Sequence, residues 1–269
     1  MRIDGSGTQR ANCLLCPNPG PMTLDGTNTW VLREPGARGV VVIDPGPHHE
    51  SHLERVARAV QEQGAQVLVT LLSHHHPDHV EGARYFSELT GAPVRAADPA
   101  YRIDGGGLAD GEVIEADGLE LRVVATPGHT ADSVSFYLPA DGALLTGDTV
   151  LGSGTTVIAA DGGLSDYMGS LFRLRELVAT ESIRTLLPGH GPLATDPMGK
   201  LTEYIQHREE RLAQVVSAVD AGARTTGEVV AHVYAGIDPA VLPAAQASVR
   251  AQLRYLTERG DIAAELSFD

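Results

Sequence analysis

The heptapeptide Ser73-His74-His75-His76-Pro77-Asp78-His79 (SHHHPDH) places four histidines and one aspartate within seven residues. It directly follows residues 67–72 (VLVTLL), an apolar run that predicts a strand buried on both faces. Neutral imidazole and carboxylate are ligands that zinc, manganese and iron accept in proteins. The stretch therefore predicts a metal site at the end of a central strand.

Side-chain direction divides this heptapeptide into two halves. In extended backbone, alternate side chains point the same way, so His74 and His76 can share one metal while His75 points elsewhere. Pro77 cannot donate a backbone hydrogen bond and helps to end the strand. Asp78 and His79 then fall at the start of a helix, expected over residues 79–90, where the turn directs them towards a second position beside the first. One short segment can thus supply ligands to two adjacent metals.

Three more candidate ligands lie far along the chain. His129, Asp148 and His190 each follow a glycine directly and come just after an apolar run that predicts a strand. Loops at the ends of strands converge on one rim of a sheet, so these side chains are expected near the heptapeptide. Asp148 is the natural bridge, because one carboxylate has two oxygens and can span two cations. The remaining histidines (His48, His49, His52, His207 and His232) have no companion ligands and are interpreted as non-ligating.

Composition limits the class of protein. The 269 residues are 42% hydrophobic but only 4% aromatic, which predicts an aliphatic core. A formal charge of −15 argues against extensive nonspecific nucleic-acid binding. No apolar run is long enough to span a bilayer and the N-terminus lacks a signal-like apolar stretch, so a cytoplasmic protein without membrane attachment is expected. Cys13 and Cys16 form a C-x-x-C without the partners that redox or zinc sites need.

The chain predicts an α/β fold in two parts. In residues 1–199, short strands alternate with helical stretches, and this part carries every candidate ligand. In residues 200–269, helices are predicted over 200–221, 228–234 and 238–258, followed by a short strand over 262–268. This second part reads as a small helical, winged-helix-like domain. Its net charge of −3 favours packing against the first part, or covering the site, over binding nucleic acid.

On these motifs the chain resembles the metallo-β-lactamase superfamily, whose fold is an αββα sandwich. His-x-His-x-Asp-His is the superfamily signature, and the resemblance covers residues 27–190. It implies that a first metal is held by His74, His76 and His129. It implies that a second is held by Asp78, His79 and His190, with Asp148 as the bridge. The opening region and the helical tail resemble the β-lactamase-like endoribonuclease group, which carries a winged-helix-like C-terminal domain.

The expected activity is hydrolysis with two divalent cations, zinc being the first choice and manganese or iron also compatible. A hydroxide bridging the two metals would attack the substrate, and Asp78 would orient it or relay its proton. The substrate is either a phosphodiester, as in single-stranded RNA, or a small ester, thioester or lactam. Aspartate at position 148, where dedicated β-lactamases have cysteine, favours the thioesterase and nuclease branches. Val80, Glu81 and Gly82 depart from the glyoxalase II pattern that follows the same ligands.

Three further residues are candidate substrate contacts. Asn28 and Thr29 lie in a loop that the superfamily places beside its site, and Tyr167 begins a helix that could line the mouth. Their alternative roles are a turn supporting the first strand and a packing aromatic. The alternative function is a non-catalytic, metal-containing module that binds nucleic acid through the winged helix, against which the complete ligand set argues. The sequence leaves the oligomeric state open.

Overall fold

The computed structural model describes residues 3–263. Two five-stranded sheets form its centre, with strand orders β1-β2-β3-β4-β5 and β10-β9-β8-β7-β6. The first sheet comprises β1 (Ala11–Leu15), β2 (Asn28–Leu32), β3 (Gly39–Ile43), β4 (Gln66–Leu71) and β5 (Val94–Arg95). The second comprises β6 (Val113–Ala116), β7 (Leu119–Ala125), β8 (Val134–Leu138), β9 (Ala143–Gly147) and β10 (Thr185–Pro188). Both sheets are mixed, because β3 pairs parallel to β4 and β9 pairs parallel to β10.

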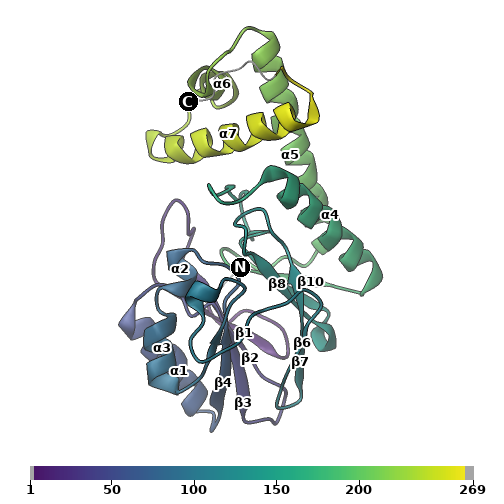
Figure 1. Ribbon diagram of the computed structural model, residues 1–269. Coiled ribbons are helices and arrows are strands. Elements are labelled where there is room, and N and C mark those ends of the chain that lie inside the picture. The colour runs from purple at the N-terminus through teal and green to yellow at the C-terminus, as the bar shows by residue number, and fades with distance from the viewer. Residues whose placement is uncertain (1–2, 264–269) are drawn as a thin grey trace.

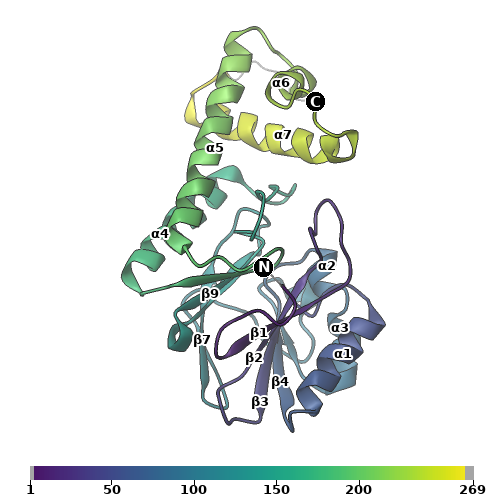
Figure 2. The same cartoon turned by 180° about the vertical axis from the view of Figure 1, so that it is seen from behind.

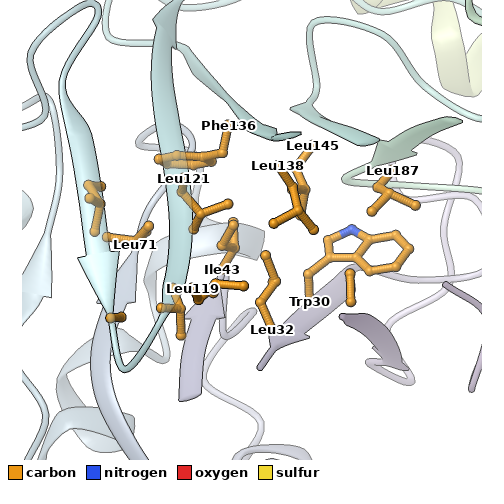
Figure 3. Packing of buried hydrophobic residues seen from close by; sticks show 14 of the residues in the cluster. Trp30, Leu32, Ile43, Leu71, Leu119, Leu121, Phe136, Leu138, Leu145 and Leu187 are labelled. Carbon is orange, nitrogen blue, oxygen red and sulfur yellow. The ribbon is translucent and has the colours of Figure 1, made fainter. Parts of the chain in front are cut away.

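The main core lies between the two sheets. Trp30, Leu32 and Ile43 of the first sheet face Leu121 and Phe136 of the second, and all five are buried (Figure 3). Burying one such side chain contributes roughly 1.5–3 kcal/mol relative to leaving it exposed. Both faces of β3 and β8 are buried, which accounts for the continuous apolar sequence of β3 and the mostly apolar sequence of β8.

Helices cover the outer face of each sheet, as Figure 1 shows. On the first sheet, α1 (Glu50–Gln61) and α3 (Ala83–Thr90) bury Leu53, Val56 and Phe86 in one apolar cluster. On the second, α4 (Leu164–Thr180) and α5 (Pro197–Asp220) bury another that includes Leu171 and Tyr204. The layers therefore run helix, sheet, sheet, helix, which confirms the expected αββα sandwich. Short helices α2 (Pro77–Val80), η1 (Pro99–Tyr101) and η2 (Pro139–Asp141) lie in its loops.

The single helix expected over residues 79–90 is two helices. The first, α2, ends at Val80, and α3 begins at Ala83. The backbone N–H of Gly82 donates to the carbonyl of Gly46 at 3.0 Å, outside both helices. A Cβ at position 82 would lie 2.7 Å from the carbonyl oxygen of Pro47, so the chain approaches the β3–α1 loop too closely for a larger residue.

The C-terminal part is helical and is carried by α5, which extends away from the sandwich (Figure 2). It adds α6 (Thr226–Val233), η3 (Pro239–Val241) and α7 (Leu242–Arg259). Thr225 begins α6 with a reciprocal capping box to Glu228, as its sequence predicts. A separate apolar cluster includes Val215 of α5 and Leu253 of α7.

The proposed division between residues 199 and 200 falls inside α5. The start of that helix buries Leu201 and Tyr204 against the sandwich, and its end buries Val215 and Ala218 against α6 and α7. One helix thus belongs to both cores. Most of the strand expected over residues 262–268 lies outside the described residues. Among the helices of residues 3–263, none combines the length and apolarity needed to cross a membrane.

Candidate metal centre

The seven candidate ligands meet at one end of the sandwich. The heptapeptide follows β4, and His129 follows β7. The parallel pairing of β9 with β10 sets Gly147 opposite Pro188, so Asp148 and His190 leave the second sheet side by side. A hydrogen bond of 2.8 Å from the backbone N–H of Val134 to the carbonyl of Ser73 joins the two sheets beside the cluster. The rim expected from the strand pattern is therefore where these side chains converge.

Three imidazoles form the first group. The Nε2 of His74 lies 3.1 Å from the Nδ1 of His76, and the Nε2 of His129 lies 2.9 Å from that same Nδ1. Two nitrogens bound to one tetrahedral zinc at ~2.0–2.1 Å would be about 3.3 Å apart. The spacing of the three nitrogens fits a shared divalent cation.

Two imidazoles and a carboxylate form the second group. The Nε2 atoms of His79 and His190 are 3.2 Å apart. The Oδ2 of Asp78 lies 3.1 Å from the Nε2 of His190 and 3.6 Å from that of His79. These distances also fit three ligands of one cation.

Asp148 lies between the two groups. Its Oδ2 is 3.3 Å from the Nε2 of His190 and 3.8 Å from that of His129, while its Oδ1 is 3.4 Å from the Nε2 of His79. Within the described residues, the buried Oδ1 has no hydrogen-bond partner. A buried carboxylate oxygen without a partner is costly. Its position beside both groups fits an atom that binds a cation.

Acceptors behind the rings set which nitrogen faces the centre. The Nδ1 of His79 donates to Asp44 at 2.9 Å, that of His129 to the carbonyl of Val157 at 2.6 Å, and that of His190 to the carbonyl of Gly26 at 3.0 Å. The Nδ1 of His74 lies 3.0 Å from the hydroxyl of Ser73. Each of these rings therefore keeps its Nε2 free to ligate, an arrangement typical of histidine metal ligands.

Asp44 supports the candidate site and was missed by the sequence interpretation, because Asp44-Pro45-Gly46 reads as an ordinary turn. It is 2% exposed and accepts from the backbone N–H and the hydroxyl of Ser73, at 2.7 and 2.6 Å, as well as from His79. It lies at the end of β3, parallel to and beside β4. An aspartate directly after an apolar strand was the available sequence signal. The structure adds that Asp44 has a positive φ of 52°, which is uncommon for a residue other than glycine.

The charges differ between the two groups. Burial, with neighbouring imidazoles, lowers the pKa of His76 to about 4 and keeps that of His74 well below its usual range. Burial opposes protonation of His190 too, but Asp148 and Asp78 outweigh it and raise the pKa of His190 to about 9. Asp148 likewise raises the pKa of His79. Because metals bind neutral imidazole, loading the second group must displace protons, whereas the first group is already neutral at pH 7.

The three candidate substrate contacts are buried and bond to backbone. Asn28 donates to the carbonyls of Pro188 and Gly191, on either side of the His190 loop, at 2.9 and 2.8 Å. Thr29 donates to the carbonyl of Pro45, next to Asp44, at 3.1 Å. These positions favour the supporting role over contact with a substrate.

Tyr167 is 0% exposed, and its hydroxyl donates to the carbonyl of Thr149 at 2.7 Å. The close approach of its backbone to Gly128 explains that glycine, where a Cβ would lie 2.3 Å from the Tyr167 Cα. Tyr167 thus fixes the loop after Asp148 and the loop before His129, which favours the packing role.

His75 lies outside both groups, as expected. Its Nδ1 is 2.8 Å from Asp132, and its ring stacks on Tyr101. Cys13 and Cys16 are buried free thiols, and burial raises the pKa of each to about 12. Thiols with so little thiolate are poor nucleophiles and ligands. Neither cysteine belongs to the metal centre.

Comparison with known proteins relates both parts of the chain to known families. Residues 22–190 match the model of the metallo-beta-lactamase superfamily, and residues 225–267 match that of the beta-lactamase associated winged helix domain. The chain is 33% identical over 257 residues to a beta-lactamase-like protein 2 homolog of Caenorhabditis elegans, covering 92% of this chain and 84% of that protein. It is 34% identical to an atrochrysone carboxyl ACP thioesterase of Aspergillus fumigatus, covering 78% and 66%.

Two solved structures share the architecture. A metallo-beta-lactamase family protein from Thermus thermophilus superposes with a TM-score of 0.77 at 26% identity, covering 93% of this chain and 94% of that one. A beta-lactamase domain protein from Burkholderia ambifaria superposes with a TM-score of 0.80 at 21% identity, covering 97% and 90%. Both likenesses extend over the sandwich and the helical C-terminal part together.

Proposed function

Because this chain belongs to the metallo-β-lactamase superfamily, we propose that it is a binuclear hydrolase of thioesters. The observation that carries the proposal is the convergence of five imidazoles and two carboxylates. Acceptors behind the rings of His79, His129 and His190 direct the Nε2 of each towards the centre. The substrate class is supported by relatives named as acyl carrier protein (ACP) thioesterases.

The two groups divide the metals between them. The first cation would be held by His74, His76 and His129, and the second by Asp78, His79 and His190. Asp148 would contact both through its two oxygens. Five imidazoles and two carboxylates without thiolate suit zinc, and the near-tetrahedral spacing supports it over metals that prefer octahedral oxygen ligands. Bound there, two such cations supply an activated water at neutral pH and polarise the substrate carbonyl.

Asp78 is the group that we propose handles protons. Its side chain is 27% exposed, against 10% for Asp148, so it faces the open side of the centre. Burial tends to raise the pKa of Asp78, but His79 and His190 outweigh burial and keep that pKa below its usual value. The carboxylate is therefore ionised at neutral pH and can orient a water or accept its proton.

The overall charge supports a small substrate over RNA. At −15, the chain repels a phosphodiester backbone at long range. A thioester carbonyl carries no such charge at the reacting centre. Hydrolysis of RNA remains the competing substrate class from the resemblance to endoribonucleases, and one assay separates the two.

The test is turnover of an acyl thioester, a single-stranded RNA and a β-lactam by one zinc-loaded sample. We expect the thioester to be hydrolysed with the highest kcat/KM. Faster cleavage of RNA or of the lactam would refute the substrate class.

Metal content and one variant test the centre itself. Metal analysis should find about two zinc ions per chain, and a chelator should abolish hydrolysis. Asp148→Ala should lose at least one metal and reduce kcat by about 10²-fold or more, with an unchanged far-ultraviolet circular dichroism spectrum. A fully active Asp148→Ala protein would exclude the bridging role.

A further inference from the structure

Among the described residues, three basic side chains and no carboxylate line a pocket beside the metal centre. It measures about 170 Å³ and lies between α5, the start of α7 and the loop that follows Asp148. His207, Arg208 and Arg211 of α5 line it, and none of the described residues around it is acidic. The pocket is therefore locally positive in a chain whose net charge is −15.

Neither arginine of this pocket, Arg208 or Arg211, forms an ion pair with a carboxylate within residues 3–263. Arg208 is only 3% exposed, and its Nε is buried without a hydrogen-bond partner. The Nδ1 of His207 is likewise buried and without a partner. Buried donors and a buried charge without partners are costly unless a ligand satisfies them.

The known contacts of the two arginines leave donors available. Arg208 donates one guanidinium N–H to the carbonyl of Thr156 and lies over the ring of Tyr167 at 5.0 Å. The Nη1 of Arg211 donates to Gln214 at 2.8 Å and to the carbonyl of Val233 at 3.3 Å, and its guanidinium lies over the ring of Tyr234 at 4.7 Å. Guanidinium groups carry five donors in a rigid fork, which suits bidentate binding of a phosphate.

The pocket shares a wall with the metal centre. Thr155, Thr156 and Val157 line it, and the carbonyl of Val157 accepts from the metal-facing ring of His129. The C-terminal helices α6 and α7 lie beyond the end of the sandwich that carries α2, as Figure 1 shows. A ligand group held here would therefore sit beside the centre, on the side covered by the C-terminal part.

The pocket is large enough for one functional group of a ligand but too small for a whole substrate. Pockets that enclose drug-sized molecules measure about 300–1,000 Å³. One phosphate suits the smaller volume, and a nucleic-acid strand would need a longer track of cations. The carriers of acyl thioesters in metabolism, coenzyme A and acyl carrier proteins, share a phosphopantetheine arm with a phosphate remote from its sulfur.

We propose that the pocket of His207, Arg208 and Arg211 binds the phosphate of the phosphopantetheine arm that carries the acyl group. This inference rests on the proposed thioesterase function. The acyl thioester then lies at the metal centre, the arm passes the Val157 loop, and the phosphate is held by α5. The C-terminal part thereby selects carrier-bound thioesters over simple ones.

The kinetic test compares one acyl group on three thiols: N-acetylcysteamine, which has no phosphate, 4′-phosphopantetheine and coenzyme A. We expect wild-type protein to show a KM at least tenfold lower for both phosphorylated thiols than for N-acetylcysteamine. Arg211→Gln should reduce this ratio about tenfold. Arg250→Gln is the matched control, because Arg250 is exposed on α7 outside the pocket and its loss changes the net charge equally.

Three outcomes would overturn the proposal. Equal KM values on all three thiols would show that the phosphate is not recognised. A preference for coenzyme A alone would place recognition at its nucleotide end. An Arg250→Gln effect as large as that of Arg211→Gln would reduce the effect to overall charge.

Direct binding separates failure of this proposal from failure of the proposed function. Calorimetric titration of the zinc-loaded protein should give tighter binding of 4′-phosphopantetheine than of unphosphorylated pantetheine, and Arg211→Gln should remove the difference. That result would support the pocket even if no thioester were hydrolysed. Equal binding of the two compounds by wild-type protein would overturn it, whatever the activity.

Discussion

At the scale of single residues, the geometry of the candidate metal centre depends on residues that support the ligands as well as on the ligands themselves. Asp44, Asn28 and Thr29 touch no candidate metal position, yet each fixes a ligand loop or a ligand ring by hydrogen bonds. Such outer partners set the orientation and basicity of ligating histidines. The geometry of the site is therefore a property of a larger set of residues than its ligands.

Asp44→Asn tests this support. The substitution keeps the size of the side chain but removes the charge that faces the Nδ1 of His79, so we expect zinc affinity at the second group to fall about 10–100-fold. Competition with a chromophoric chelator measures it. Asp132→Asn is the control, since Asp132 pairs with His75, which lies outside both ligand groups. The zinc affinity of this variant at the second group should equal that of wild type. Equal affinities in all three proteins would contradict the role of Asp44.

Gly189→Ala tests how closely the backbone approaches the ligands. A Cβ there would lie 2.5 Å from the Oδ1 of Asp148 and 2.8 Å from the Cε1 of His79. We expect loss of bound zinc and of activity with the fold retained. Gly169→Ala on α4 is the matched control, since its Cβ would meet nothing within 4 Å. It should leave zinc content unchanged and raise stability by up to about 1 kcal/mol. Full zinc content in Gly189→Ala, measured by metal analysis, would show that a Cβ at position 189 does not displace the ligands.

The convergence of the candidate ligands could be predicted from sequence and the residues that support them could not, for a physical reason. Imidazole and carboxylate side chains at strand ends carry a local pattern that marks them, as His74 and His190 show. Asp44 and Val157 become visible only when strands and loops distant in sequence are brought together. Val157 contributes a backbone carbonyl, which any residue has, so no residue type could identify it.

At the scale of elements, the sandwich is tied at its edge by one arginine. Arg10, just before β1, forms ion pairs of 2.6 Å with both Glu34 and Asp141, and so links the first sheet to η2 of the second. The Asp141 side chain is only 4% exposed. Burial raises the pKa of Asp141, but hydrogen bonds from Thr8 and Arg10 outweigh burial and lower that pKa below its usual value.

Asp141→Asn should therefore destabilise the protein in a pH-dependent way. A carboxylate whose pKa is depressed on folding contributes stability that is complete above its unfolded pKa of about 3.9 and is lost as the pH falls through its folded value. We expect the difference in unfolding free energy between wild type and variant to be largest near pH 7 and to shrink below pH 4. Urea unfolding at pH 7 and pH 3 measures it, and a difference independent of pH would exclude this linkage.

Most elements could be predicted from sequence, and the exceptions share a cause. The apolar runs of β3, β4 and β9 and the capped start of α6 carry strong local signals. The edge strand β1 and the two-residue β5 do not, because only pairing with a neighbour makes them strands. The break between α2 and α3 at Gly82 likewise depends on contact with a loop from another part of the chain.

At the scale of the whole molecule, α5 joins the two parts into one structure. Its first turns complete the cluster around Tyr204, and its last turns complete the cluster around Val215. The division inferred from composition at residue 199 lies within this helix. The sequence pattern changes near residue 199, close to the start of α5. Packing nevertheless places α5 in the cores of both parts.

Two truncations test the role of α5. A chain ending at residue 199 should be poorly soluble and lose its cooperative thermal transition, because the buried Leu201, Tyr204 and Ile205 leave the sandwich. A chain ending at residue 224 retains α5 and should keep a folded sandwich with a lower Tm. Circular dichroism melts of soluble protein measure both. A chain ending at residue 199 with the wild-type Tm would show that the sandwich does not need α5.

The distribution of the ligands between the two sheets has a consequence for the order of assembly. His74, His76, Asp78 and His79 follow β4 in the first sheet, whereas His129, Asp148 and His190 follow strands of the second. Each half-site alone is incomplete, so high-affinity capture of zinc requires that the sheets have already docked. For the proposed zinc enzyme, we therefore expect zinc uptake during refolding to be a late kinetic event that reports docking of the two sheets. The proposed ions would then cross-link two halves of the chain that synthesis releases one after the other.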